Sequence, residues 1–116
     1  MKGAKLISEA NKDAVQRAMA AGCHIILATA RRQWRTRKYA RQLGLNKPII
    51  CDNGARVFGS PDGPLWREAG LPLAVAQRVC EVANARGWEL STVVGEINYL
   101  RQRPGQPLGL IEPGLE

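Results

Sequence analysis

Two short apolar segments, separated by a basic stretch, constrain the fold of this chain more than any other feature. Residues 23–29 form a continuous apolar run that ends in Thr29, and residues 47–51 form a second run that precedes a polar turn. An uninterrupted apolar run is typical of a strand that is buried on both faces of a sheet. Strand, helix and strand in this order predict a βαβ unit with parallel strands and a right-handed crossover. The expected fold class is therefore α/β.

The ends of these two strands predict a binding rim. In an open α/β sheet, ligands bind beyond the carboxyl ends of the strands. This rule gathers Thr29, Ala30, Arg31, Asp52 and Asn53 on one rim. A hydroxyl, a guanidinium and an amide are groups that can hold a phosphate. Asp52 is the one carboxylate at this rim, and we expect it to have a structural role and not to act as a nucleophile.

Two helices are expected around the first strand. Ser8 can cap a helix that runs to about residue 21 and ends at Gly22, with an inner face of Ala14, Val15, Ala18 and Met19. The second helix, residues 33–43, ends at Gly44. Its spacing leaves Trp34, Ala40 and Leu43 to face a core.

After Gly54 the pattern changes to α+β. We expect a hairpin over 56–67 around the turn 59–63, then a helix over 73–86 that ends at Gly87, and strands over 88–94 and 97–101. The inner face of that helix is expected to comprise Val75, Val79, Val82 and Ala83. The proline- and glycine-rich segment 103–109 is expected to be extended or loose. The predicted organisation is a partial core over 1–53, a partial α+β region over 54–103 and a loose tail over 104–116.

The net charge of +7 comes largely from six residues near the second helix: Arg31, Arg32, Arg35, Arg37, Lys38 and Arg41. This basic helix could serve as a contact surface for a phosphate substrate, a nucleic acid or an acidic partner. Alternatively, it could be an ordinary solvated face. Since no aromatic ladder or known nucleic-acid motif accompanies it, nucleic acid is not expected as a partner.

Several functional classes are excluded or disfavoured by the sequence. No apolar run is long enough to span a bilayer, and the first residues lack the apolar segment of a secretory signal. Three widely spaced cysteines without a CxxC pair indicate buried, reduced thiols, as in a cytoplasmic protein. The single histidine, His24, excludes a histidine-rich metal site and disfavours a histidine-based catalytic dyad.

Three sequence elements together resemble the haloacid dehalogenase-like (HAD) superfamily, in particular its Cof-type sugar-phosphate phosphatase branch. They are residues 7–22, then Ile25-Ile26-Leu27-Ala28-Thr29-Ala30-Arg31, then Asn53-Gly54-Ala55. In order and spacing they are similar to that branch's first helix, second motif and core-to-cap junction. The resemblance covers residues 5–101. One departure is Ala30, where the branch usually has glycine.

This resemblance implies a hydrolase of phosphate monoesters that uses Mg²⁺. In the family, an aspartate attacks phosphorus to form an aspartyl-phosphate and a second aspartate acts as acid and base. The position of Thr29 implies a hydrogen bond to a phosphoryl oxygen, and Arg31, Asn53 and Gly54 are implied to bind the substrate. The implied fold is a partial Rossmann-like HAD core followed by part of an α+β cap.

Other family motifs do not occur in this sequence. There is no DxD before the first helix and no Gly-Asp-x-x-x-Asp segment, and the three aspartates, Asp13, Asp52 and Asp62, are not paired at catalytic spacing. We therefore expect a truncated hydrolase that is inactive alone and supplies no metal ligands. Without the family's first strand, the strand at 23–29 would have an unpaired edge, which predicts a homodimer through that edge. The alternative is a non-catalytic binding module that uses the basic helix 31–41.

Overall fold

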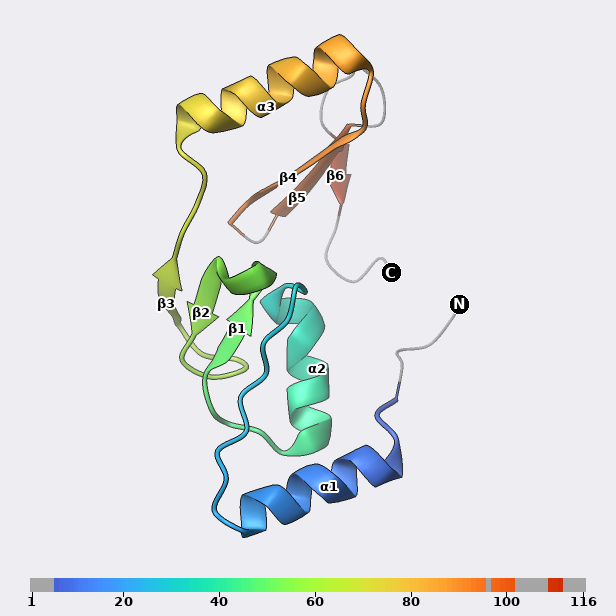
Figure 1. Ribbon diagram of the computed structural model, residues 1–116, viewed down its shortest axis with the longest axis vertical. Helices are drawn as coiled ribbons and strands as arrows, with labels where there is room; N and C mark the ends of the chain where they lie inside the picture. The colour runs from blue at the N-terminus through green and yellow to red at the C-terminus, as the bar shows by residue number, and fades with distance from the viewer. Residues whose placement is uncertain (1–5, 96, 102–108, 112–116) are drawn as a thin grey trace. The chain divides into compact units, whose positions relative to one another are not determined.

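The computed structural model describes residues 6–95, 97–101 and 109–111. The chain divides into two compact units, one up to Ala69 and one from Gly70. The elements of each unit are labelled in Figure 1.

Both predicted helices of the first unit are confirmed, because their ends are determined locally. Helix α1 (Glu9–Ala20) begins after Ser8, whose hydroxyl oxygen accepts a hydrogen bond from the backbone N–H of Asn11 at 3.2 Å. Helix α2 (Gln33–Leu43) ends at Gly44, which adopts a left-handed conformation with φ of 66°.

The first core cluster lies between these helices and the segment that joins them. Helix α2 buries Thr36, Ala40 and Leu43, whereas the expected Trp34 is only partly buried. Thr36 can occupy the inner face because its hydroxyl donates a hydrogen bond to the carbonyl of Arg32 at 2.8 Å. Partly buried residues pack against the cluster of Ala40, Leu43 and Leu45: Ile7, Val15, Met19, Ile25 and Leu27.

The sheet of the first unit has three antiparallel strands in the order β1 (Ile49–Cys51), β2 (Arg56–Phe58) and β3 (Leu65–Glu68). Ile49, Cys51 and Phe58 form the second buried cluster, against which Leu27 packs. The predicted hairpin is confirmed, but it pairs with β1. The hairpin therefore belongs to the first compact unit, which runs to Ala69, and the domain boundary after residue 53 stays a prediction.

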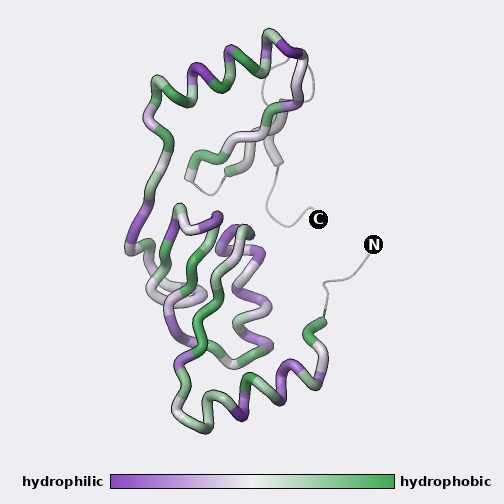
Figure 2. Tube along the Cα trace, in the orientation of Figure 1, coloured by the Kyte–Doolittle hydropathy of each residue, from purple (hydrophilic) through white to green (hydrophobic). Residues whose placement is uncertain are grey.

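Residues 23–29 are the parallel neighbour of β1, as predicted. Ala28 and Ile50 form a parallel bridge, with hydrogen bonds from Thr29 N to Ile50 O and from Ile50 N to Leu27 O, both 2.9 Å. Figure 2 shows hydrophobic colour along this segment and along β1. The prediction that this segment is buried on both faces was wrong. Ile26 is 50% exposed, because in the described part of the chain the helices pack only against the face that carries Ile25 and Leu27.

The second unit contains helix α3 (Leu73–Arg86) and an antiparallel sheet of β4 (Leu90–Val94), β5 (Ile97–Arg101) and β6 (Gly109–Ile111). The helix and the first two strands confirm the prediction. Strand β6 lies within the tail that was expected to be loose, because residues 109–111 pair with β5; residues 102–108 and 112–116 lie outside the described residues.

The inner face predicted for α3 is only partly buried. Ala83 is buried and Val82 is partly buried, but Val75 and Val79 are 45% and 47% exposed. The helical periodicity correctly identified an apolar stripe, but a stripe is buried only where another element covers it.

The cysteines and the helix lengths bear on the environment of the chain. All three cysteines are free thiols, but only Cys51 is buried; Cys23 is exposed and Cys80 is partly buried. Among the described residues, no helix combines the length and apolar character needed to cross a membrane.

Candidate active site

A pocket of about 360 Å³ lies where residues 23–29 and β1 reach their carboxyl ends. Its lining comprises Ala28, Thr29, Ala30, Ile50, Asn53 and Gly54. The pocket coincides with the predicted rim. The structure therefore brings together three of the four predicted site residues: Thr29, Asn53 and Gly54.

The hydroxyl of Thr29 is placed so that its hydrogen can be donated to a ligand. Its oxygen accepts a hydrogen bond from the backbone N–H of Arg31 at 3.0 Å. A threonine hydroxyl has one hydrogen to donate and two lone pairs to accept with. Among the described residues the hydroxyl donates no hydrogen bond, so its hydrogen can be donated to a ligand.

The turn Asp52–Gly54 forms the other side of the pocket and has an unusual backbone. Its three successive residues have positive φ values of 52°, 57° and 92°. Aspartate and asparagine tolerate the left-handed region better than most residues, and such conformations are concentrated at functional sites. Two backbone hydrogen bonds connect the turn to residues 29–31. They run from Asp52 N to Arg31 O at 3.0 Å and from Asn53 N to Thr29 O at 3.1 Å.

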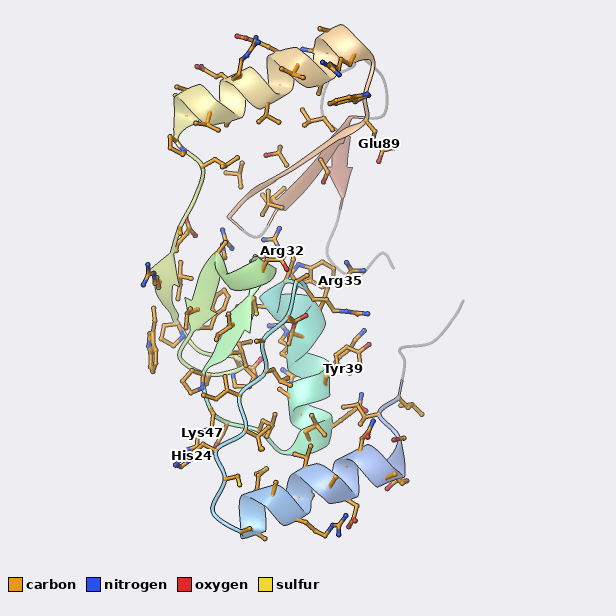
Figure 3. The ribbon with its side chains drawn as sticks, viewed as in Figure 1. His24, Arg32, Arg35, Tyr39, Lys47 and Glu89 are labelled. Atoms are coloured by element: carbon orange, nitrogen blue, oxygen red, sulfur yellow. The ribbon has the colours of Figure 1, made fainter. Side chains whose placement is uncertain are left out.

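Arg31 is the predicted site residue that does not line the pocket. Its side chain is exposed, and its guanidinium lies 5.5 Å from the centre of the Tyr39 ring, within the range of a cation–π contact. Figure 3 shows Tyr39 on α2. A role for Arg31 in substrate binding stays a prediction.

Two buried arginines flank the turn, and the sequence did not single them out as site residues. Arg32 and Arg56 are 5% and 8% exposed. The carboxylate of Asp52 lies between them, with Oδ1 at 3.9 Å from Arg32 Nε and Oδ2 at 4.0 Å from Arg56 Nε. Arg56 also pairs with Glu68 at 3.1 Å. Figure 3 shows Arg32 at the end of α2 where the turn lies.

One signal for Arg56 was present in the sequence. In β2, side chains alternate between the faces of the sheet, so Arg56 shares the face of buried Phe58. Arg32 had been grouped with the basic helix, although it precedes the first residue of α2. The two guanidinium groups lie beside the turn that lines the pocket, and the carboxylates of Asp52 and Glu68 pair with them.

The described residues do not fit a magnesium site. They contain no cluster of three His, Cys, Asp or Glu side chains that could hold a metal. Both oxygens of Asp52 face arginines, and Mg²⁺ needs several oxygen ligands in octahedral geometry. The Mg²⁺ that the resemblance implies has no ligand set in this part of the chain.

The basic helix has partners within the same unit. Asp62, in the hairpin turn, pairs with Arg41 at 2.8 Å and with Arg37 at 3.7 Å. Gln33 donates a hydrogen bond to the carbonyl of Gly63 at 3.1 Å. Two of the four basic side chains of α2 therefore contact the hairpin turn.

Comparison with known proteins agrees with this geometry. The family model of haloacid dehalogenase-like hydrolases matches residues 1–104. No curated protein matches the chain significantly.

Three solved structures share the fold. One is a haloacid dehalogenase-like hydrolase from B. subtilis, with 20% identity, a TM-score of 0.67, and coverage of 80% of this chain and 32% of that one. The second, from Bacteroides thetaiotaomicron, was analysed among phosphatases of the haloalkanoate (HAD) superfamily. It has 20% identity and a TM-score of 0.69, and the match covers 81% of this chain and 34% of that one. The third is a hypothetical protein from Geobacillus kaustophilus, with 22% identity and a TM-score of 0.64. The match covers 83% of this chain and 36% of that one.

These likenesses establish the fold, and the chain spans about a third of the length of each of the three structures. The family model covers most of the chain. The α/β unit with its pocket at the strand ends, followed by an α+β unit, fits the same assignment. The chain belongs to the haloacid dehalogenase-like hydrolase family.

Proposed function

We propose that this chain forms part of a Mg²⁺-dependent phosphatase of the Cof-type branch, which hydrolyses phosphate monoesters such as sugar phosphates through an aspartyl-phosphate. The observation that carries the proposal is the pocket that Thr29, Asn53 and Gly54 line together. The family assignment and the presence of a phosphatase-superfamily protein among the similar structures support it.

The chemistry of the pocket fits an anionic substrate. A phosphoryl group in transfer carries negative charge on its peripheral oxygens, so catalysis depends on donors placed around it. The Thr29 hydroxyl supplies one donor, and the Asn53 side chain can supply another.

We propose that the nucleophile comes from outside this sequence and that the chain alone is inactive. Each of its three aspartates pairs with arginine: Asp13 with Arg17 at 3.0 Å, Asp52 with Arg32 and Arg56, and Asp62 with Arg41 and Arg37. None of these aspartates lines the pocket. The free cysteines are consistent with the reducing conditions of the cytoplasm, where we place the activity.

The test is hydrolysis of an aryl phosphate in the presence of Mg²⁺. The chain is compared with an extended form that includes the codons flanking it in frame. We expect activity in the extended form only. Activity of the short chain would contradict the external nucleophile, and inactivity of both forms would overturn the phosphatase proposal.

The alternative, a binding module built on the basic helix, has no specific observation in its favour. Arg37 and Arg41 pair with Asp62, and Arg31 and Lys38 lie 5.5 and 5.3 Å from the centre of the Tyr39 ring. These four of the six basic residues therefore have partners within the chain. Tight binding to RNA or DNA that weakens steeply with salt would favour the alternative.

We further propose that the chain self-associates through the free edge of residues 23–29. Leu27 and Thr29 direct their backbone bonds to Ile50, so the N–H and C=O groups of Ile26 and Ala28 point to the opposite edge. Within the described part of the chain, nothing hydrogen-bonds these groups. An unpaired edge beside a half-exposed isoleucine is a template for pairing with a second copy.

Light scattering over a range of concentrations checks this self-association. We expect the wild-type chain to form dimers and Ile26→Lys to shift it toward the monomer, because a lysine on an edge strand disfavours pairing. The matched control is Leu6→Lys, which changes another exposed apolar residue of the first unit, 83% exposed, and leaves the edge intact. A wild-type chain that is monomeric at every concentration would contradict the proposal.

A further inference from the structure

The turn Asp52–Gly54 keeps a conformation that is unfavourable for residues with side chains. Asp52 and Asn53 are the only non-glycine residues in the described part of the chain with positive φ. Such a conformation persists only where the surroundings hold it in place. Two backbone hydrogen bonds, to the carbonyls of Arg31 and Thr29, provide part of this support.

The side chain of Asp52 offers further support. Its carboxylate, which is 19% exposed, reaches behind the turn to the two arginines described above, with Oδ1 toward Arg32 and Oδ2 toward Arg56. Arg32 precedes α2 and Arg56 opens β2, so one carboxylate connects the two structural elements on either side of the turn. Breaking a buried ion pair by removing one partner is destabilising, so these contacts favour the observed arrangement of the turn.

We infer that Asp52 is a positioning residue: its ion pairs with Arg32 and Arg56 hold the turn in the left-handed conformation that places Asn53 and Gly54 on the wall of the pocket. The expected effect on phosphate binding rests on the proposed function, because it assumes that the pocket binds phosphate. The expected effect on the conformation of the turn does not depend on that function. Asp52 touches no ligand in this role and acts through the backbone that follows it.

The variant that isolates this role is Asp52→Asn. Asparagine tolerates positive φ as aspartate does and has nearly the same shape, so the substitution removes the charge and keeps the local backbone preference. The matched control is Glu68→Gln. It makes the same change of charge at the other carboxylate that pairs with Arg56. The Glu68 side chain is 49% exposed.

The measurement is nuclear magnetic resonance of the ¹⁵N-labelled chain, with and without inorganic phosphate. We expect backbone couplings and shifts in Asp52→Asn to lose the left-handed signature at residues 52 and 53, and the phosphate affinity to fall about tenfold, as when an orienting partner is removed from a metal site. Glu68→Gln should keep both the left-handed signature and the phosphate affinity. Asp52→Glu, which restores the charge, should recover part of the signature.

Unchanged turn signals in a folded Asp52→Asn variant would overturn the inference. If phosphate does not bind the wild-type chain, the phosphate-site assignment fails, but the turn signals still decide the positioning role. If Asp52→Asn does not fold, Arg32→Gln is compared in the same way, and an unaltered turn in that variant would also overturn the inference.

Discussion

Thr29→Val is expected to lower kcat of the extended form about 10²- to 10³-fold, the loss seen when one donor to a developing negative charge is removed. Valine has nearly the shape of threonine, so the pocket keeps its size. The substitution removes the hydroxyl, and with it the hydrogen that Thr29 can donate to a ligand. Steady-state hydrolysis of an aryl phosphate measures the effect.

Two controls separate the loss of the donor from damage to the fold. Thr29→Ser keeps the hydroxyl and should keep most of the activity. Ser91→Ala removes an exposed hydroxyl on β4, outside the pocket, and should leave kcat unchanged. If Thr29→Val retains full activity, Thr29 is not a phosphoryl contact.

Ile49→Ala is expected to lower the free energy of unfolding by about 2–5 kcal/mol, as for other large-to-small core substitutions. Ile49 is 1% exposed, and its buried cluster contains only two other members, Cys51 and Phe58. Since small domains are only marginally stable, this loss is a large fraction of the total free energy of unfolding. Urea unfolding followed by circular dichroism measures the change.

The matched control makes the same substitution at Ile26, which is 50% exposed. Because less apolar surface is buried there, Ile26→Ala should cost less than about 1 kcal/mol. The measurement is made at a concentration where the chain is monomeric, so that self-association does not bury this side chain. Equal losses at Ile49 and Ile26 would contradict the assignment of the core.

The sequence was sufficient for the helices and for the location of the pocket. The ends of α1, α2 and α3 follow from Ser8, Gly44 and Gly87, which act within one turn of the helix they bound. The pocket could be located because parallel strands end at the same edge of a sheet, which is a property of the βαβ connection. Thr29 and the turn Asp52–Gly54 therefore meet as predicted.

The sequence was not sufficient to predict which apolar residues are buried or which charged groups form ion pairs. Apolar patterns predicted residues 23–29 as doubly buried and Val75 and Val79 as inward, yet Ile26, Val75 and Val79 are about half exposed in the structure. Periodicity identifies an apolar face, whereas burial depends on whether another element covers it.

By itself, the sequence predicted the helices, the parallel pairing of residues 23–29 with β1, and the place of Thr29, Asn53 and Gly54 among the six residues that line the pocket. Only the tertiary structure decided that the hairpin of β2 and β3 joins β1, that Arg31 lies on Tyr39, and that Asp52 pairs with both Arg32 and Arg56. The reason is physical. Caps and strand patterns depend on neighbours along the chain, but an ion pair or a strand pairing depends on distances between residues that only the folded backbone sets.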